Sequence, residues 1–89
     1  MPWTYEIDAA ALADLRRLGP STETAIRTWL EKRVKGATNP RLFGKPLRGR
    51  LHGLWRYRVP DYRLLCQLQD HRLVVLVITI GHRSAIYED

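Results

Sequence analysis

The sequence predicts an α+β fold with the element order β-α-α-β-β-β, in which two N-terminal helices pack on a largely antiparallel sheet. Two observations lead to this prediction. Apolar residues recur at helical spacing in two segments before Gly36, and three strand-like runs joined by short turns follow from Leu54 onward. Because 89 residues are too few for two independent cores, we expect residues 1–89 to form a single domain.

The N-terminal part predicts one strand and two helices. Apolar and polar residues alternate over residues 2–7, which is typical of a strand with one buried face. Asp8 can cap a first helix that Gly19-Pro20 ends, and Ser21 or Thr22 can cap a second one. Each helix has one apolar side, formed by Leu12, Leu15 and Leu18 in the first and by Ile26, Trp29, Leu30 and Val34 in the second.

The C-terminal part predicts hairpins. Residues 37–53 are rich in Gly and Pro and form the main irregular connection, with a short strand near Leu47. Three strands then follow, and the last is apolar on both faces, so we expect it to be central and covered on each side. Cys66 lies in an apolar run and is expected to act as a small hydrophobe. The three strands are Leu54–Val59, Tyr62–Gln69 and Leu73–Ile80, joined by turns at Pro60-Asp61 and Asp70-His71.

The charge distribution predicts an anionic partner. Fifteen Lys and Arg against nine Asp and Glu give a net charge of +6, and no acidic residue occurs from Lys32 to Pro60. Arginine outnumbers lysine, and its planar fork suits bidentate phosphate contacts. The alternative is a merely solvated basic surface. No apolar run could span a membrane and no signal segment is present, so we expect no membrane association and a cytoplasmic protein.

Several arginines are predicted to share one face of the sheet. Side chains alternate along a strand, so Arg56 and Arg58 point to the same side. Arg63 follows a short turn and should lie opposite Arg58, where two like charges repel unless an anion separates them. Arg83 and Tyr87 follow the last strand and could reach the same face. The pattern favours a phosphate site, although each arginine alone is more often an ordinary solvated side chain.

Four short motifs, taken in order, resemble the successive signatures of RelE-family toxins of the RelE/ParE superfamily across essentially the whole chain. The resemblance implies a RelE-like microbial ribonuclease fold and a toxin of a type II toxin-antitoxin system. Such toxins cleave mRNA in the ribosomal A site and so inhibit translation. The motifs are Lys45-x-Leu47-x-Gly49, Leu54-Trp55-Arg56-x-Arg58, Tyr62-Arg63-Leu64 and Gly81-His82-Arg83-x-x-x-Tyr87.

The same resemblance assigns roles and partners. It assigns Arg56 and Arg58 to the reacting 2′-hydroxyl and to stabilisation of the charge in the transition state. Arg63 and Arg83 are assigned to binding the scissile phosphate, and Tyr87 to stacking on a base. Preorganised guanidinium groups suit the charge that develops during such an attack. The implied partners are an acidic RelB-like antitoxin, the ribosome with its mRNA and rRNA, and operator DNA bound by the toxin-antitoxin complex. Further RNA contacts are expected from Lys45, Arg48 and Arg50.

Positions 56 and 58 hold arginine, whereas lysine is frequent there in the family. Because a guanidinium does not lose a proton near neutral pH, the identity of the general base stays open. His82 is a candidate for proton transfer, but strand alternation places it opposite Arg83, and hydrogen bonding within the fold is the alternative. His52 and His71 have no partner at metal-ligand spacing, so we expect no metal and no cofactor.

Two other functions remain open. One is a ParE-like, non-enzymatic toxin of the same fold that inhibits DNA gyrase, although such proteins generally lack the arginine and tyrosine set found here. The other is an RNA-binding module without toxicity. That module would normally expose aromatic side chains on its sheet, and here the sequence offers only Tyr87 for this purpose.

Overall fold

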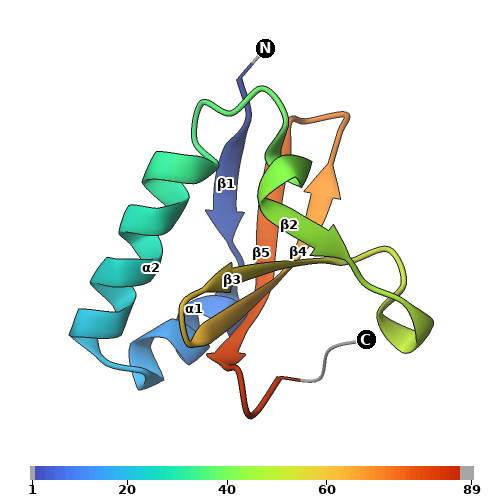
Figure 1. Ribbon diagram of the computed structural model, residues 1–89. Coiled ribbons are helices and arrows are strands. Elements are labelled where there is room, and N and C mark those ends of the chain that lie inside the picture. The colour runs from blue at the N-terminus through green and yellow to red at the C-terminus, as the bar shows by residue number, and fades with distance from the viewer. Residues whose placement is uncertain (1, 87–89) are drawn as a thin grey trace.

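A computed structural model describes residues 2–86 as a five-stranded sheet with two helices packed against it (Figure 1). The strand order is β1-β5-β4-β3-β2, and only the β1–β5 pair is parallel. This confirms the predicted α+β fold and its largely antiparallel sheet. The elements are β1 (Thr4–Ile7), α1 (Ala9–Arg17), α2 (Pro20–Arg33), the 3-10 turn η1 (Pro40–Phe43), β2 (Gly44–Pro46), the 3-10 turn η2 (Gly49–Leu51), β3 (Trp55–Val59), β4 (Tyr62–Gln69) and β5 (Val74–His82).

The two helices begin in different ways. Asp8 caps α1 as predicted, because its carboxylate accepts a hydrogen bond of 3.0 Å from the backbone N–H of Ala11. The predicted cap of α2 by Ser21 or Thr22 is wrong. The helix already begins at Pro20, whose fixed φ and missing N–H suit the first helical position, and Gly19 precedes it without a side-chain cap.

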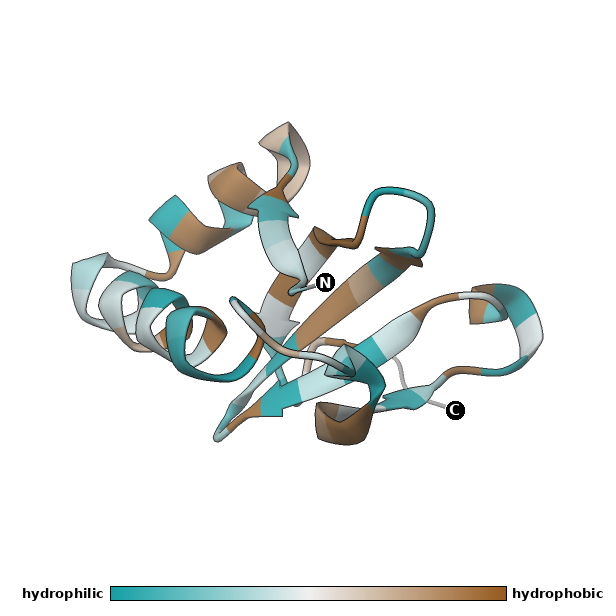
Figure 2. Ribbon diagram, turned by 90° about the horizontal axis from the view of Figure 1, so that it is seen from above, coloured by the Kyte–Doolittle hydropathy of each residue, from teal (hydrophilic) through white to brown (hydrophobic). Residues whose placement is uncertain are grey.

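The hydrophobic core lies between the helices and one face of the sheet. Leu15 of α1 and Ile26 and Leu30 of α2 are completely buried there, together with Tyr57 and Leu64 from the strands. In Figure 2 teal and brown segments alternate along the helices, as expected for elements with one exposed and one buried side. Cys66 is also completely buried in this cluster, which confirms its expected role as a small hydrophobe.

The last strand differs from its prediction in extent and in burial. Leu73 belongs to the preceding turn with a positive φ of 55°, and β5 continues past Ile80 to His82. The strand lies between β1 and β4, as expected of an interior strand. However, the helices cover only one of its faces, and Leu76 and Thr79 on the other remain half-buried. The expectation of a strand covered on each side is therefore wrong.

The predicted irregular connection is held to the sheet at a few defined points. The strand expected near Leu47 is β2, and the N–H of Leu47 continues its pairing by donating to the carbonyl of Leu54 (2.9 Å). The buried hydroxyl of Tyr57 donates to the carbonyl of Pro40 (2.9 Å), which fixes η1 against β3. A Cβ at Gly44 would lie 2.7 Å from the backbone oxygen of Arg56, so only glycine fits where β2 begins. Among residues 2–86, no helix is long and apolar enough to cross a membrane.

Candidate functional site

The side of the sheet opposite the helices carries a cluster of cations, which we call the arginine face. Cross-strand partners project to the same side of a sheet, and the register pairs Lys45 with Arg56 and Arg58 with Arg63. Alternation along β3 then joins the two pairs, because Arg56 and Arg58 lie two residues apart. The arginine face consists of Lys45, Arg56, Arg58 and Arg63. The predicted proximity of Arg58 and Arg63 is confirmed.

Arg63 is fixed by the turn that precedes it. Its Nη1 donates to the carbonyl oxygens of Pro60 and Tyr62, both at 3.0 Å, and the residue is buried. These carbonyls offset part of the cost of burying a guanidinium. Arg58 lies directly opposite and is exposed. A rigid cation beside a solvated one forms a pair that an anion would stabilise.

A hollow of about 240 Å³ opens at the β2 side of this face, and we call it the strand hollow. Arg56 is buried, whereas Lys45 and Arg58 are exposed. Within the described part of the chain, neither Lys45 nor Arg58 forms an ion pair. The hollow is lined by Leu42, Phe43, Gly44, Lys45, Arg56 and Arg58.

The segment after β5 approaches the arginine face. The N–H of Arg83 donates to the carbonyl of Asp61 (2.7 Å), which holds residue 83 next to the turn that leads into Arg63. Arg83 itself is exposed. Ile86 packs over Gly81, where a Cβ would lie 2.7 Å from its side chain, and Gly81 is the register partner of Arg63. Tyr87 lies outside the described residues.

His82 is on the other side of the strand. It is the register partner of Tyr62, the two rings meet edge to face with centroids 5.7 Å apart, and Tyr62 contacts Thr22 of α2. The Nδ1 of His82 also lies 2.8 Å from the Ser84 hydroxyl and accepts from the Ser84 N–H at 3.2 Å. The fold therefore does not bring His82 to the arginine face.

The remaining basic residues of the central stretch have different surroundings. Arg48 and Arg50 are both exposed. Arg50 lines a second, mainly apolar hollow of about 350 Å³ together with Leu65 and Ile86. Arg41 is structural, because its guanidinium makes two hydrogen bonds of 3.0 and 2.8 Å to the Asp70 carboxylate and lies over two tryptophan rings. This pairing holds the pKa of Asp70 below its usual value.

Comparison with known proteins identifies the family. A model of the ParE toxin of the type II toxin-antitoxin system parDE matches residues 5–87. The chain belongs to the RelE/ParE superfamily of toxins. Toxin RelG of Mycobacterium tuberculosis is 32% identical over 87 residues, covering 98% of either chain, and the mRNA interferase toxin RelE of Escherichia coli is 30% identical, covering 100% of this chain and 94% of the relative.

Solved structures agree with this assignment to the RelE-like toxins. The toxin-antitoxin complex RelBE2 of M. tuberculosis superimposes with a TM-score of 0.83 at 30% identity, over 93% of this chain and the whole of that one. The fold and the toxin family predicted from the motifs are thus confirmed.

Two features of this RelE-like toxin were not predicted from its sequence. Leu42 is 76% exposed and Phe43 is 37% exposed, so an apolar pair stands on the surface within the basic stretch. Phe43 is therefore an aromatic candidate for contact with a ligand, in addition to the Tyr87 expected from the sequence. The signal was present in the sequence as two apolar residues between Asn39-Pro40 and Gly44, flanked by cations.

The described residues of the toxin offer little other chemistry. Among residues 2–86, no group of three or more His, Cys, Asp or Glu side chains is placed to hold a metal ion. Burial raises the pKa of the Cys66 thiol, so this group stays protonated and is a poor nucleophile near neutral pH.

Proposed function

We propose that this toxin is a ribosome-dependent endoribonuclease that cleaves mRNA in the A site and thereby inhibits translation. The observation that carries the proposal is the arginine face, where Lys45, Arg56, Arg58 and Arg63 lie in cross-strand register beside an open hollow. The naming of the E. coli relative as an mRNA interferase supports it. The similar solved structure from M. tuberculosis is a toxin-antitoxin complex, and we propose that an acidic RelB-like antitoxin binds the basic surface of this toxin.

The proposed reaction is an attack of a ribose 2′-hydroxyl oxygen on the adjacent phosphorus. The new P–O2′ bond forms as the P–O5′ bond breaks, which leaves a 2′,3′-cyclic phosphate and a 5′-hydroxyl. The 2′-hydroxyl loses a proton and the 5′-oxygen gains one. Negative charge accumulates on the non-bridging oxygens, where Arg58 and Arg63 would stabilise it, with Arg83 close to the same turn. The proposed reaction uses no metal ion and no other cofactor.

Rigid placement of the cations favours this chemistry. Arg63 is anchored by two carbonyl oxygens and Arg56 is buried, so these guanidinium groups need little reorganisation during the reaction. In this proposal Arg56 and Arg58 supply charge and do not act as bases, since a guanidinium stays protonated. His82 lies across the sheet and takes no part. Tyr87 is proposed to stack on a base, and Arg48 and Arg50 to contact rRNA from their exposed positions.

The test is primer extension on a defined mRNA held in purified programmed ribosomes. We expect a cut within the A-site codon that requires the ribosome. Absence of any cut by the wild-type protein, combined with inhibition of supercoiling by purified DNA gyrase, would instead establish the non-enzymatic ParE-like function. The arginine face would then be a binding surface only.

A further inference from the structure

Leu42 and Phe43 separate two basic hollows. The strand hollow lies on one side of the pair. On the other side is a hollow of about 290 Å³ between η1 and the C-terminal end of α2, which we call the α2 hollow. Its volume is close to the lower end for small-molecule sites, at about 300 Å³. The α2 hollow is lined by Lys32, Arg33, Lys35, residues 36–39, Leu42 and Phe43.

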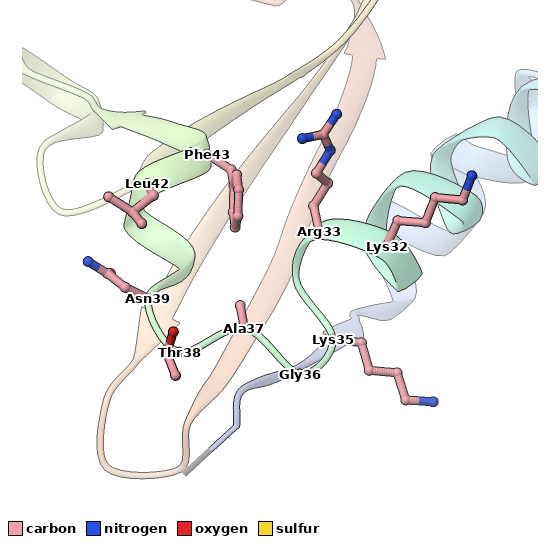
Figure 3. Close-up of a pocket in the computed structure, with 9 residues that line it drawn as sticks. All are labelled: Lys32, Arg33, Lys35, Gly36, Ala37, Thr38, Asn39, Leu42 and Phe43. Carbon is pink, nitrogen blue, oxygen red and sulfur yellow. The ribbon is translucent and has the colours of Figure 1, made fainter.

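Phe43 and Arg33 define the shape of the α2 hollow. Figure 3 shows the Phe43 ring directed from η1 into the space between η1 and α2, with the Arg33 side chain rising from the end of α2 on the facing side. Lys32 and Lys35 project away from this space in the same view, and Lys35 forms an ion pair with Glu31. An aromatic ring and a planar guanidinium therefore face the same opening.

This pairing of groups matches an unstacked nucleobase. Single-stranded RNA is recognised mainly by stacking of splayed bases on aromatic rings and on arginine planes, while nearby cations contact its phosphates. Here the stacking groups and the phosphate-binding groups are neighbours, because Phe43 lines both the α2 hollow and the strand hollow with Lys45 and Arg58. No acidic residue occurs from Lys32 to Pro60, and Glu31 and Asp70 are paired with Lys35 and Arg41.

We infer that the α2 hollow is a base-binding subsite, in which Phe43 and Arg33 hold the base of a nucleotide close to the phosphate bound at the arginine face. The inference rests on the proposed ribonuclease function and deepens it. An exposed phenylalanine beside an exposed leucine gains stability when an apolar ring system covers it. Phe43 is thus a positioning residue that would set which nucleotides are cut efficiently.

A short single-stranded RNA tests the subsite without the ribosome. The probe carries 2′-O-methyl groups, which prevent cleavage, and one 2-aminopurine whose fluorescence is quenched on stacking. We expect quenching at one base position on addition of the wild-type toxin. Phe43→Ala should abolish the quenching and weaken binding by about 5-fold to 150-fold, the range typical for loss of one stacked base. Phe43→Trp should keep both the quenching and the RNA affinity of the wild type.

Exposed cations provide matched variants that leave the core untouched. Arg33→Ala should reduce quenching, whereas Arg16→Ala removes the same charge from an exposed position of α1 that does not line the hollow and should leave quenching intact. Equal quenching and affinity in Phe43→Ala and the wild type would overturn the inference. The inference would also be overturned if Phe43→Ala bound RNA normally but lost affinity for an acidic peptide. Leu42 and Phe43 would then form a protein-docking surface.

Failure of this inference can be told apart from failure of the proposed function. If the wild type cuts A-site codons and Phe43→Ala shows unchanged kcat/KM for every codon, the subsite is refuted and the ribonuclease remains. If the wild type cuts nothing on the ribosome but position-specific quenching persists, the subsite stands as an RNA-binding site and the ribonuclease is refuted.

Discussion

Tyr57→Phe should destabilise the toxin measurably although it removes a single oxygen atom. The Tyr57 hydroxyl is completely buried and donates to the Pro40 carbonyl at 2.9 Å. Water cannot replace it there, so we expect the free energy of unfolding to fall by about 1–2 kcal/mol. For a chain of this size each kcal/mol corresponds to roughly 4–8 °C in Tm. Thermal unfolding followed by circular dichroism should therefore show a drop of about 5–15 °C.

Tyr5→Phe is the matched control. The Tyr5 hydroxyl also donates a hydrogen bond, to Glu31 at 2.6 Å, but this bond is exposed and both groups return to water when it is lost. Its loss should cost less than about 1 kcal/mol. If Tyr57→Phe melted like the wild type, or lost less stability than Tyr5→Phe, the Tyr57 hydroxyl would not be what holds η1 to the sheet.

Three further results are expected. Cys66 should react with iodoacetamide only in denaturant, because burial raises its pKa; rapid modification of the folded protein would contradict this. Asp70→Asn should lower Tm at pH 7, because Arg41 lowers the pKa of Asp70 and the ion pair therefore stabilises the folded state above the ordinary aspartate pKa of about 3.9. This loss of Tm should shrink as the pH falls below that value, and a loss that did not change with pH would exclude the ion pair as its cause. Gly44→Ala should disturb the β2–β3 pairing and reduce cleavage, since the new Cβ would lie 2.8 Å from the Tyr57 ring. Full cleavage activity of this variant would show that β2 can shift to accommodate the Cβ without loss of function.

Local patterns in the sequence predict much of this fold. The Asp8 cap can be predicted because its hydrogen bond is local and joins residues only three positions apart, Asp8 and Ala11. The placement of Arg56 and Arg58 on one face follows from strand alternation, and the short Pro60-Asp61 turn brings Arg63 opposite Arg58. Each of these features depends on neighbours in the chain.

The features that sequence reasoning missed depend on distant contacts. The exposure of Phe43 results from the way η1 is held by Tyr57, a residue 14 positions further along the chain. The burial of Arg63 depends on carbonyl oxygens that only the folded turn presents. The start of α2 is a local exception, because Pro20 at the first helical position competes with the polar residues that follow it, and the proline prevails.

In the proposed function, the arginine face carries out the cleavage. The most direct test is the single-turnover rate of A-site cleavage on programmed ribosomes for Arg58→Ala and for Arg16→Ala, which removes the same charge from an exposed position of α1. Arg58→Ala should reduce the rate by about 100-fold to 1,000-fold, as loss of one preorganised donor typically does, and Arg16→Ala should leave it unchanged. Equal rates for both variants and the wild type would show that Arg58 takes no part in cleavage and that the chemistry lies elsewhere.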